Sequence, residues 1–173
     1  MSSPVTLAPL QAAHAPAIVR WLSDPVVSAN LGLRSTPTLE KTLAFIAAAA
    51  SDETLCARAI VLSGQHVGNV VLDQIDRRVD KARLHIYVGE ASARGHGVGQ
   101  RAVALALGLA FDELALHKVW LTVHAKNTGA IRAYEHAGFR LEGTHRDEFL
   151  LDGARVDELH MGVLSGEQKS SPR

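Results

Sequence analysis

A glycine-rich turn that joins an alternating strand to a helix with an uncharged middle constrains the fold of this chain most. Residues 82–89 alternate apolar and polar side chains, as in a strand with one buried face. The turn 94–99 follows, and the segment 102–111 after it carries no charge. A helix with so few polar side chains packs against other elements on more than one side. Because another strand is expected at 118–123, the segment 82–123 predicts a parallel, right-handed strand–helix–strand unit.

Hydrophobic periodicity predicts the remaining elements of one domain. Asp24-Pro25 should end the first helix, because a residue before proline is pushed out of the helical region, and 30–37 reads as irregular. The other expected elements are a strand at 5–10, helices at 12–22 and 38–50, strands at 54–62 and 67–75, a helix at 127–137, and a hairpin of 139–151 with 155–164 turning at Asp152-Gly153. We therefore expect an α/β (α+β) fold with one mixed, mostly antiparallel sheet of about seven strands and about four helices. Residues 1–164 would form the domain, and 165–173 a polar tail.

Composition excludes several classes of function. The chain has 173 residues, 18 Lys+Arg and 18 Asp+Glu, so no basic excess points to nucleic acid or to an anionic membrane surface. Cys56 is the only cysteine, which excludes an internal disulfide and fits a cytoplasmic protein. No signal peptide and no apolar run long enough to span a membrane is expected. The nine histidines show no His-x-x-x-His pair, so we expect no metal site.

The turn itself has the chemistry of a pyrophosphate site. Glycines let backbone N–H groups approach a ligand, and the helix that follows begins with unsatisfied N–H groups and a partial positive charge. The residues expected at the phosphates are Arg94, Gly95, His96, Gly97, Val98, Gly99 and Gln100. A tight turn without a ligand is the simpler alternative.

Two other nucleotide-binding motifs also place glycines before a helix. Gly97-x-Gly99-x-x-Ala102 matches a Rossmann pattern, but no acidic residue ends the strand 118–124 to hold a ribose. A Walker loop is excluded, because no Gly-Lys-Ser/Thr follows the glycines.

A second motif follows the next strand. Asn127 is a natural N-cap, and Tyr134 lies seven residues later, so both side chains share one helix face. Capping by the asparagine and core packing by the tyrosine would explain the two residues without any ligand.

Together, Arg94-x-x-Gly-x-Gly99 and Asn127-x-x-Ala-Ile-x-x-Tyr134-x-x-x-Gly-Phe139 are similar to the signature of the GNAT N-acetyltransferase superfamily. The resemblance is firm from 82 to 164. The segment from Leu141 to Met161 looks like the subgroup that acetylates ribosomal-protein N-termini, and spermidine and amino-sugar acetyltransferases share much of that pattern.

The resemblance implies an acetyl-CoA site. The strand at Ile86, Tyr87 and Val88 would splay from its parallel neighbour, so that free backbone groups pair with pantetheine and a backbone N–H polarises the thioester carbonyl. Asn127 and Ala130 would contact the pantetheine arm, and Tyr134 would protonate the departing thiolate. The amine would attack directly, without an acyl-enzyme, so Cys56 is expected in a buried strand rather than as a nucleophile.

The sequence defines the general base and the acceptor less well. Glu90 follows the central strand and is the predicted base, with His85, Asp73 and Glu148 as further candidates. A solvated turn carboxylate without a catalytic role is the simpler interpretation of Glu90. The helices between 12 and 50 should shape the acceptor pocket. We expect a primary amine acceptor, favouring a protein N-terminal α-amine, since a low-pKa amine needs little help from a base. A non-catalytic acyl-CoA-binding sensor is the alternative, and a homodimer is one assembly that the sequence allows.

Overall fold

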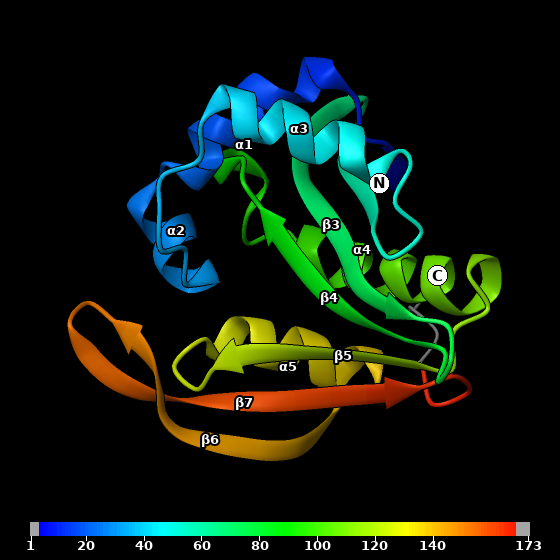
Figure 1. Cartoon of the computed structure of the whole chain (residues 1–173). Coiled ribbons are helices and arrows are strands. Elements are labelled where there is room, and N and C mark those ends of the chain that lie inside the picture. Colours follow the sequence, from blue (N-terminus) through cyan, green and yellow to red (C-terminus); the bar gives the residue numbers. More distant parts are fainter. Residues whose placement is uncertain (1–3, 169–173) are drawn as a thin grey trace.

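The computed structural model describes residues 4–168, which form one seven-stranded sheet with helices on both faces (Figure 1). The strands are β1 (Val5–Pro9), β2 (Cys56–Leu62), β3 (Gln65–Asp76), β4 (Lys81–Val88), β5 (Lys118–His124), β6 (Arg140–Leu151) and β7 (Ala154–Leu164). The α-helices are α1 (Ala15–Leu22), α2 (Pro25–Leu31), α3 (Leu39–Ala49), α4 (Val98–Gly108) and α5 (Thr128–Ala137).

The strand order confirms the predicted mixed sheet. It runs β1-β2-β3-β4-β5-β7-β6, and every neighbouring pair is antiparallel except β4 and β5. Helix α4 connects these two parallel strands, as the glycine turn and the charge-free segment 102–111 predicted. Asp152-Gly153 joins β6 to β7, also as predicted.

Each face of the sheet has its own core. Leu84 of β4 and Leu121 of β5 pack with Val103 of α4 in the larger cluster. On the opposite face, Trp21 of α1 and Ile46 of α3 form a smaller cluster that Tyr87 joins. Successive side chains of a strand point to opposite faces, so His85 lies on the same face as Tyr87.

Cys56 is buried in β2, where the sequence placed it. Burial raises the pKa of its thiol, which disfavours the thiolate form and agrees with a packing role.

The structure corrects the prediction around Pro25. Asp24-Pro25 ends α1, but it also begins α2, a helix that the sequence analysis missed within 24–31. Asp24 Oδ1 accepts the N–H groups of Val26 at 2.8 Å and Val27 at 3.4 Å, and Pro25 occupies the first helical position. Gly32 ends the helix with a left-handed φ of 62°.

Two helix ends also differ from the expected ones. The predicted helix at 12–22 begins with a 3₁₀ turn at Ala12–His14, and α4 continues into a π-helical turn at Leu109–Glu113. The predicted C-terminal tail begins with a turn at 165–167, and residues 169–173 of that tail lie outside the described residues.

The divergence of β4 from β5 positions the site. The two strands pair only from Lys81 with Lys118 to Arg83 with Trp120. Beyond that point they separate, and Figure 1 shows the resulting V, with α2 near its open end. The later residues of β4 therefore have no partner strand on the β5 side.

Candidate active site

A cavity of about 660 Å³ occupies the gap between the diverging strands. Residues of β4, β5, the glycine turn, α5 and α2 form most of its wall. All predicted site residues except His96 and Glu90 line it, namely Ile86, Tyr87, Val88, Arg94, Gly95, Gly97, Val98, Gly99, Gln100, Asn127, Ala130 and Tyr134. A smaller recess of about 110 Å³ lies against the same residues of β4 and α5.

The edge of β4 presents free backbone groups to the cavity. The Gly89 N–H donates to Val67 O at 2.8 Å, and hydrogen-bonded positions alternate along an antiparallel pair. The backbone groups of Tyr87 therefore face β3, and those of Ile86 and Val88 face the gap. The Val88 carbonyl accepts from Arg94 Nε at 2.9 Å, so the N–H and C=O of Ile86 and the N–H of Val88 are left for a ligand.

The glycine turn brings an open helix N-terminus to the other end of the cavity. Gly97 precedes α4 with a φ of 72°, and Gly95 has a φ of 78°. A Cβ atom on either would meet no heavy atom within 4 Å, so these glycines are required by backbone conformation and leave room for a ligand. Helix N–H groups and the helix dipole favour an anion there.

Arg94 has a different role from the one its sequence position suggests. Its guanidinium donates to Val88 O and to Gly89 O, the latter at 2.7 Å, and so ties the glycine turn to the end of β4. Arg94 still lines the cavity, where it contributes positive charge near the turn.

Asn127 and Tyr134 lie on the facing helix, α5. Asn127 Oδ1 accepts the Ala130 N–H at 3.2 Å, as an N-cap does, and its Nδ2 has no hydrogen-bond partner among the described residues. The Tyr134 ring packs against the Phe139 ring, with the ring centroids 5.6 Å apart, and Tyr134 is 9% exposed. Burial raises the pKa of the Tyr134 phenol to about 12, so the hydroxyl is protonated at neutral pH.

Of the four candidate bases, the structure brings only His85 to the cavity wall. Glu90 lies outside the lining, where its carboxylate accepts from Arg20 Nη2 at 3.1 Å and Trp21 Nε1 at 3.4 Å. This contact fixes α1 to the end of β4. Glu148 is exposed on β6, outside the lining.

His85 and Asp73 form a pair. His85 Nε2 lies 3.2 Å from Asp73 Oδ2, and Arg83 binds both oxygens of the same carboxylate at 2.9 and 2.8 Å. Although burial alone would raise the pKa of Asp73, the hydrogen bonds from His85 and Arg83 hold it well below its usual range. A carboxylate that is ionised at neutral pH thus orients the imidazole that lines the cavity.

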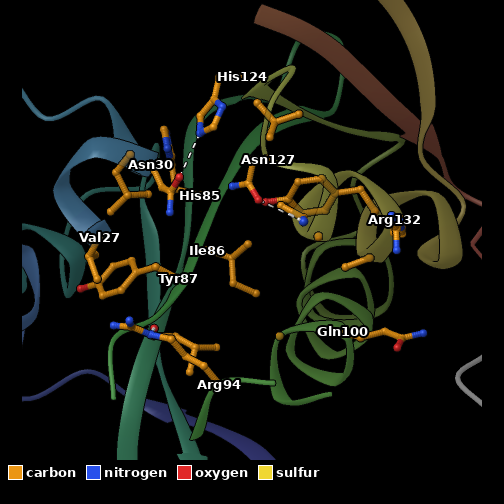
Figure 2. A pocket seen from close by; sticks show the side chains of 18 of the residues that line it. Val27, Asn30, His85, Ile86, Tyr87, Arg94, Gln100, His124, Asn127 and Arg132 are labelled. Atoms are coloured by element: carbon orange, nitrogen blue, oxygen red, sulfur yellow. Dashed lines mark hydrogen bonds between the residues drawn. The ribbon is translucent and has the colours of Figure 1, made fainter. Parts of the chain in front are cut away.

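Several lining residues escaped the sequence analysis, and most lie near α2. They are Val26, Val27, Asn30 and Leu31 of α2, Thr122 and His124 of β5, Phe149 of β6 and Glu158 of β7. Asn30 Oδ1 lies 2.9 Å from His124 Nε2, and the His124 and Phe149 rings are 4.9 Å apart. Figure 2 shows Val27 and Asn30 on one side of the cavity and Gln100 and Arg132 on the other. The cap and proline of 24–25 were the signal for α2, but no motif marks the rest.

Within residues 4–168, no group of three or more His, Cys, Asp or Glu side chains is placed to hold a metal ion. None of the helices described for this chain combines the length and the apolar character needed to cross a bilayer.

Comparisons with known proteins agree with this geometry. An acetyltransferase (GNAT) domain model matches residues 5–140. The chain is 31% identical over 103 residues to the probable N-acetyltransferase YjcK of Bacillus subtilis and 32% identical over 101 residues to spermidine N(1)-acetyltransferase of Escherichia coli K12. These matches cover 60% and 58% of this chain, but only 57% and 54% of the two relatives, or about half their length.

Solved structures share the fold over nearly the whole chain. Spermidine N-acetyltransferase from Vibrio cholerae, in complex with CoA and spermine, has a TM-score of 0.88 at 22% identity and covers 94% of this chain and 96% of that one. Mycobacterium smegmatis RimJ, in complex with CoA-disulfide, has a TM-score of 0.83 at 22% identity and covers 94% and 83%. With the matched domain, the splayed strands and the glycine turn, the chain belongs to the GNAT acetyltransferase family.

Proposed function

We propose that this protein transfers the acetyl group of acetyl-CoA directly to a primary amine, with a protein N-terminal α-amine as the favoured acceptor. The observation that carries the proposal is the cavity between β4 and β5, in which a protonated tyrosine faces free backbone groups of a strand edge. Its two ends differ in chemistry, because the glycine turn lies at one and α2 at the other.

The residues present fit CoA. The N–H groups at the start of α4 would bind the pyrophosphate, and the free groups of Ile86 and Val88, with the Asn127 side chain, would pair with the pantetheine arm. Bound acetyl-CoA supplies the thioester that the amine attacks. A backbone N–H of β4 that faces the gap is placed to stabilise negative charge on the thioester oxygen.

The acceptor and the cofactor would approach from opposite faces of the sheet. Val88 packs with the α4 and α5 core, whereas His85 belongs to the face of α1. The strand gap connects the two faces. This arrangement supports direct transfer without a covalent enzyme intermediate.

His85 is our proposed base. An acceptor ammonium must lose a proton before it attacks, and the imidazole lines the cavity with Asp73 behind it. Glu90, the base predicted from the sequence, stays a second candidate, although its carboxylate is engaged by Arg20. The variants H85Q and E90Q distinguish them, because loss of the true base should lower kcat/KM by about a hundredfold or more.

Tyr134 is the proposed acid. The departing thiolate needs a proton, and a phenol whose pKa is about 12 carries one throughout the neutral range. Its hydroxyl has no hydrogen-bond partner among the described residues, so it is free to reach the sulfur.

The experiment is a transfer assay at neutral pH with acetyl-CoA and a short peptide bearing a free N-terminus. Mass spectrometry should locate the acetyl group on the α-nitrogen. Binding of CoA without transfer to any amine would favour the alternative, a non-catalytic acyl-CoA sensor. Calorimetry that detects NAD but not CoA would reject the cofactor assignment.

A further inference from the structure

The end of the cavity away from the glycine turn has its own composition. Glu158 of β7 lies opposite His124 of β5 in the antiparallel register, so both side chains face the same side of the sheet. His124 contacts Asn30 of α2 and the ring of Phe149. These contacts gather α2, β5, β6 and β7 around one volume. We call it the acceptor end, formed by Val26, Val27, Leu31, Phe149 and Glu158.

Glu158 is the distinctive charge of the acceptor end. Among the described residues that line the cavity, it carries the one carboxylate. The described part of the chain offers Glu158 no hydrogen bond or ion pair, in contrast to Asp73, which is held by Arg83 and His85. Arg83 attracts this half-buried carboxylate electrostatically, but Arg83 is hydrogen-bonded to Asp73, so the Glu158 oxygens are left to accept hydrogen bonds from a cationic ligand.

The rest of the acceptor end is apolar. Val26 and Val27 lie on successive positions of α2, Leu31 follows one turn later, and Phe149 packs beside them through its contact with Gly32 at the end of the helix. Val26 is 60% exposed, although it is a large apolar residue. An apolar group of a ligand would gain by covering these side chains.

From this composition we infer that the acceptor carries a single ammonium group with an apolar substituent next to it, which Glu158 and the α2–Phe149 wall recognise together. The inference rests on the proposed transferase function and narrows its substrate. A polyamine carries several ammonium groups, and only one of them would find a carboxylate here. Selectivity would follow from these unpaired charges as well as from the apolar contact.

Matched acceptors test the substrate class. Leucinamide, glycinamide, lysinamide and spermidine vary the apolar group and the number of cations separately. We expect kcat/KM for leucinamide to exceed that for glycinamide by about tenfold or more, the scale of burying an aliphatic side chain. Lysinamide and spermidine should be poorer than leucinamide.

Variants test the two elements of the site. E158Q should raise KM for leucinamide and lower kcat/KM about ten- to a hundredfold, since it removes a charge-assisted hydrogen bond, while CoA affinity stays unchanged. E53Q makes the same change at an exposed residue outside the cavity and should leave both values as they are. V26E adds a second carboxylate at an exposed position and should improve lysinamide relative to leucinamide by about two- to fivefold.

The outcomes separate the inference from the function on which it rests. If no amine is acetylated, the transferase assignment fails. If transfer occurs but spermidine is preferred to leucinamide, or E158Q behaves like E53Q, the assignment of the acceptor end is wrong while the transferase stands.

Discussion

Tyr134 carries the clearest chemical role of any single residue. It is buried, it is protonated at neutral pH, and it lines the cavity. We predict that Y134F lowers kcat about ten- to a hundredfold, the usual range for loss of an acid catalyst, because the thiolate then leaves without a proton donor. The dissociation constant of CoA, measured by calorimetry, should hardly change. An unaltered kcat with chemistry limiting would remove Tyr134 from the reaction.

A substitution at Gly97 tests the proposed binding of the CoA pyrophosphate at the start of α4. G97V forces a branched side chain to a φ of 72° at the start of α4, which should displace the N–H groups that bind phosphate. We predict at least tenfold weaker CoA binding, from about 1–2 kcal/mol of backbone strain. G64V is the matched control, since Gly64 has a φ of 81° and open space around it in the β2–β3 hairpin. Equal CoA affinity in both variants would contradict the assignment.

Among the elements, helix α2 forms one wall of the acceptor end, so its position determines the shape of that part of the cavity. Gly32 has a φ of 62°, and a Cβ atom there would lie 2.8 Å from the Phe149 ring. G32A should therefore push the end of α2 away from β6 and disturb the contact between Asn30 and His124. We predict a severalfold higher KM for the amine with unchanged CoA affinity, from steady-state kinetics and calorimetry. A weaker affinity for CoA with an unchanged KM would place α2 at the wrong end of the cavity.

Elements with strong local signals were predictable, and those fixed by long-range contacts were not. The glycine turn, the charge-free segment 102–111 and the Asn127 cap carry their periodicity and capping residues in the sequence itself. Helix α2 is only seven residues long, so its cap was read as the end of α1. Glu158 and His124 come together through the β5–β7 register, which no local pattern encodes.

The whole molecule should respond to pH through His124, which is buried, and His66, which is half-buried. Burial lowers the pKa of His66, and burial with the charge of Lys126 lowers that of His124, from the ordinary 6.5. As the pH falls, the two histidines therefore bind protons in the unfolded chain before they do so in the folded protein. Their contribution to the free energy of unfolding is complete above pH 6.5 and decreases below it. We predict that the free energy of unfolding, from urea titrations, decreases as the pH falls from about 7 to about 5.

A variant isolates the contribution of His124. H124Q cannot titrate, yet its amide can still donate to Asn30, so its stability should depend less steeply on pH than that of the wild type. Identical slopes for the two proteins would show that His124 does not titrate with unfolding in this range.

Acceptor-dependent release of the CoA thiol tests most directly whether the whole molecule is an acetyltransferase. Acetyl-CoA and the protein are mixed with and without leucinamide or an N-terminal peptide, and free thiol is followed over time for wild type and Y134F. We expect thiol release that requires the amine, matches acetylated amine in amount and is at least tenfold slower in Y134F. CoA binding without any amine-dependent release would contradict the account.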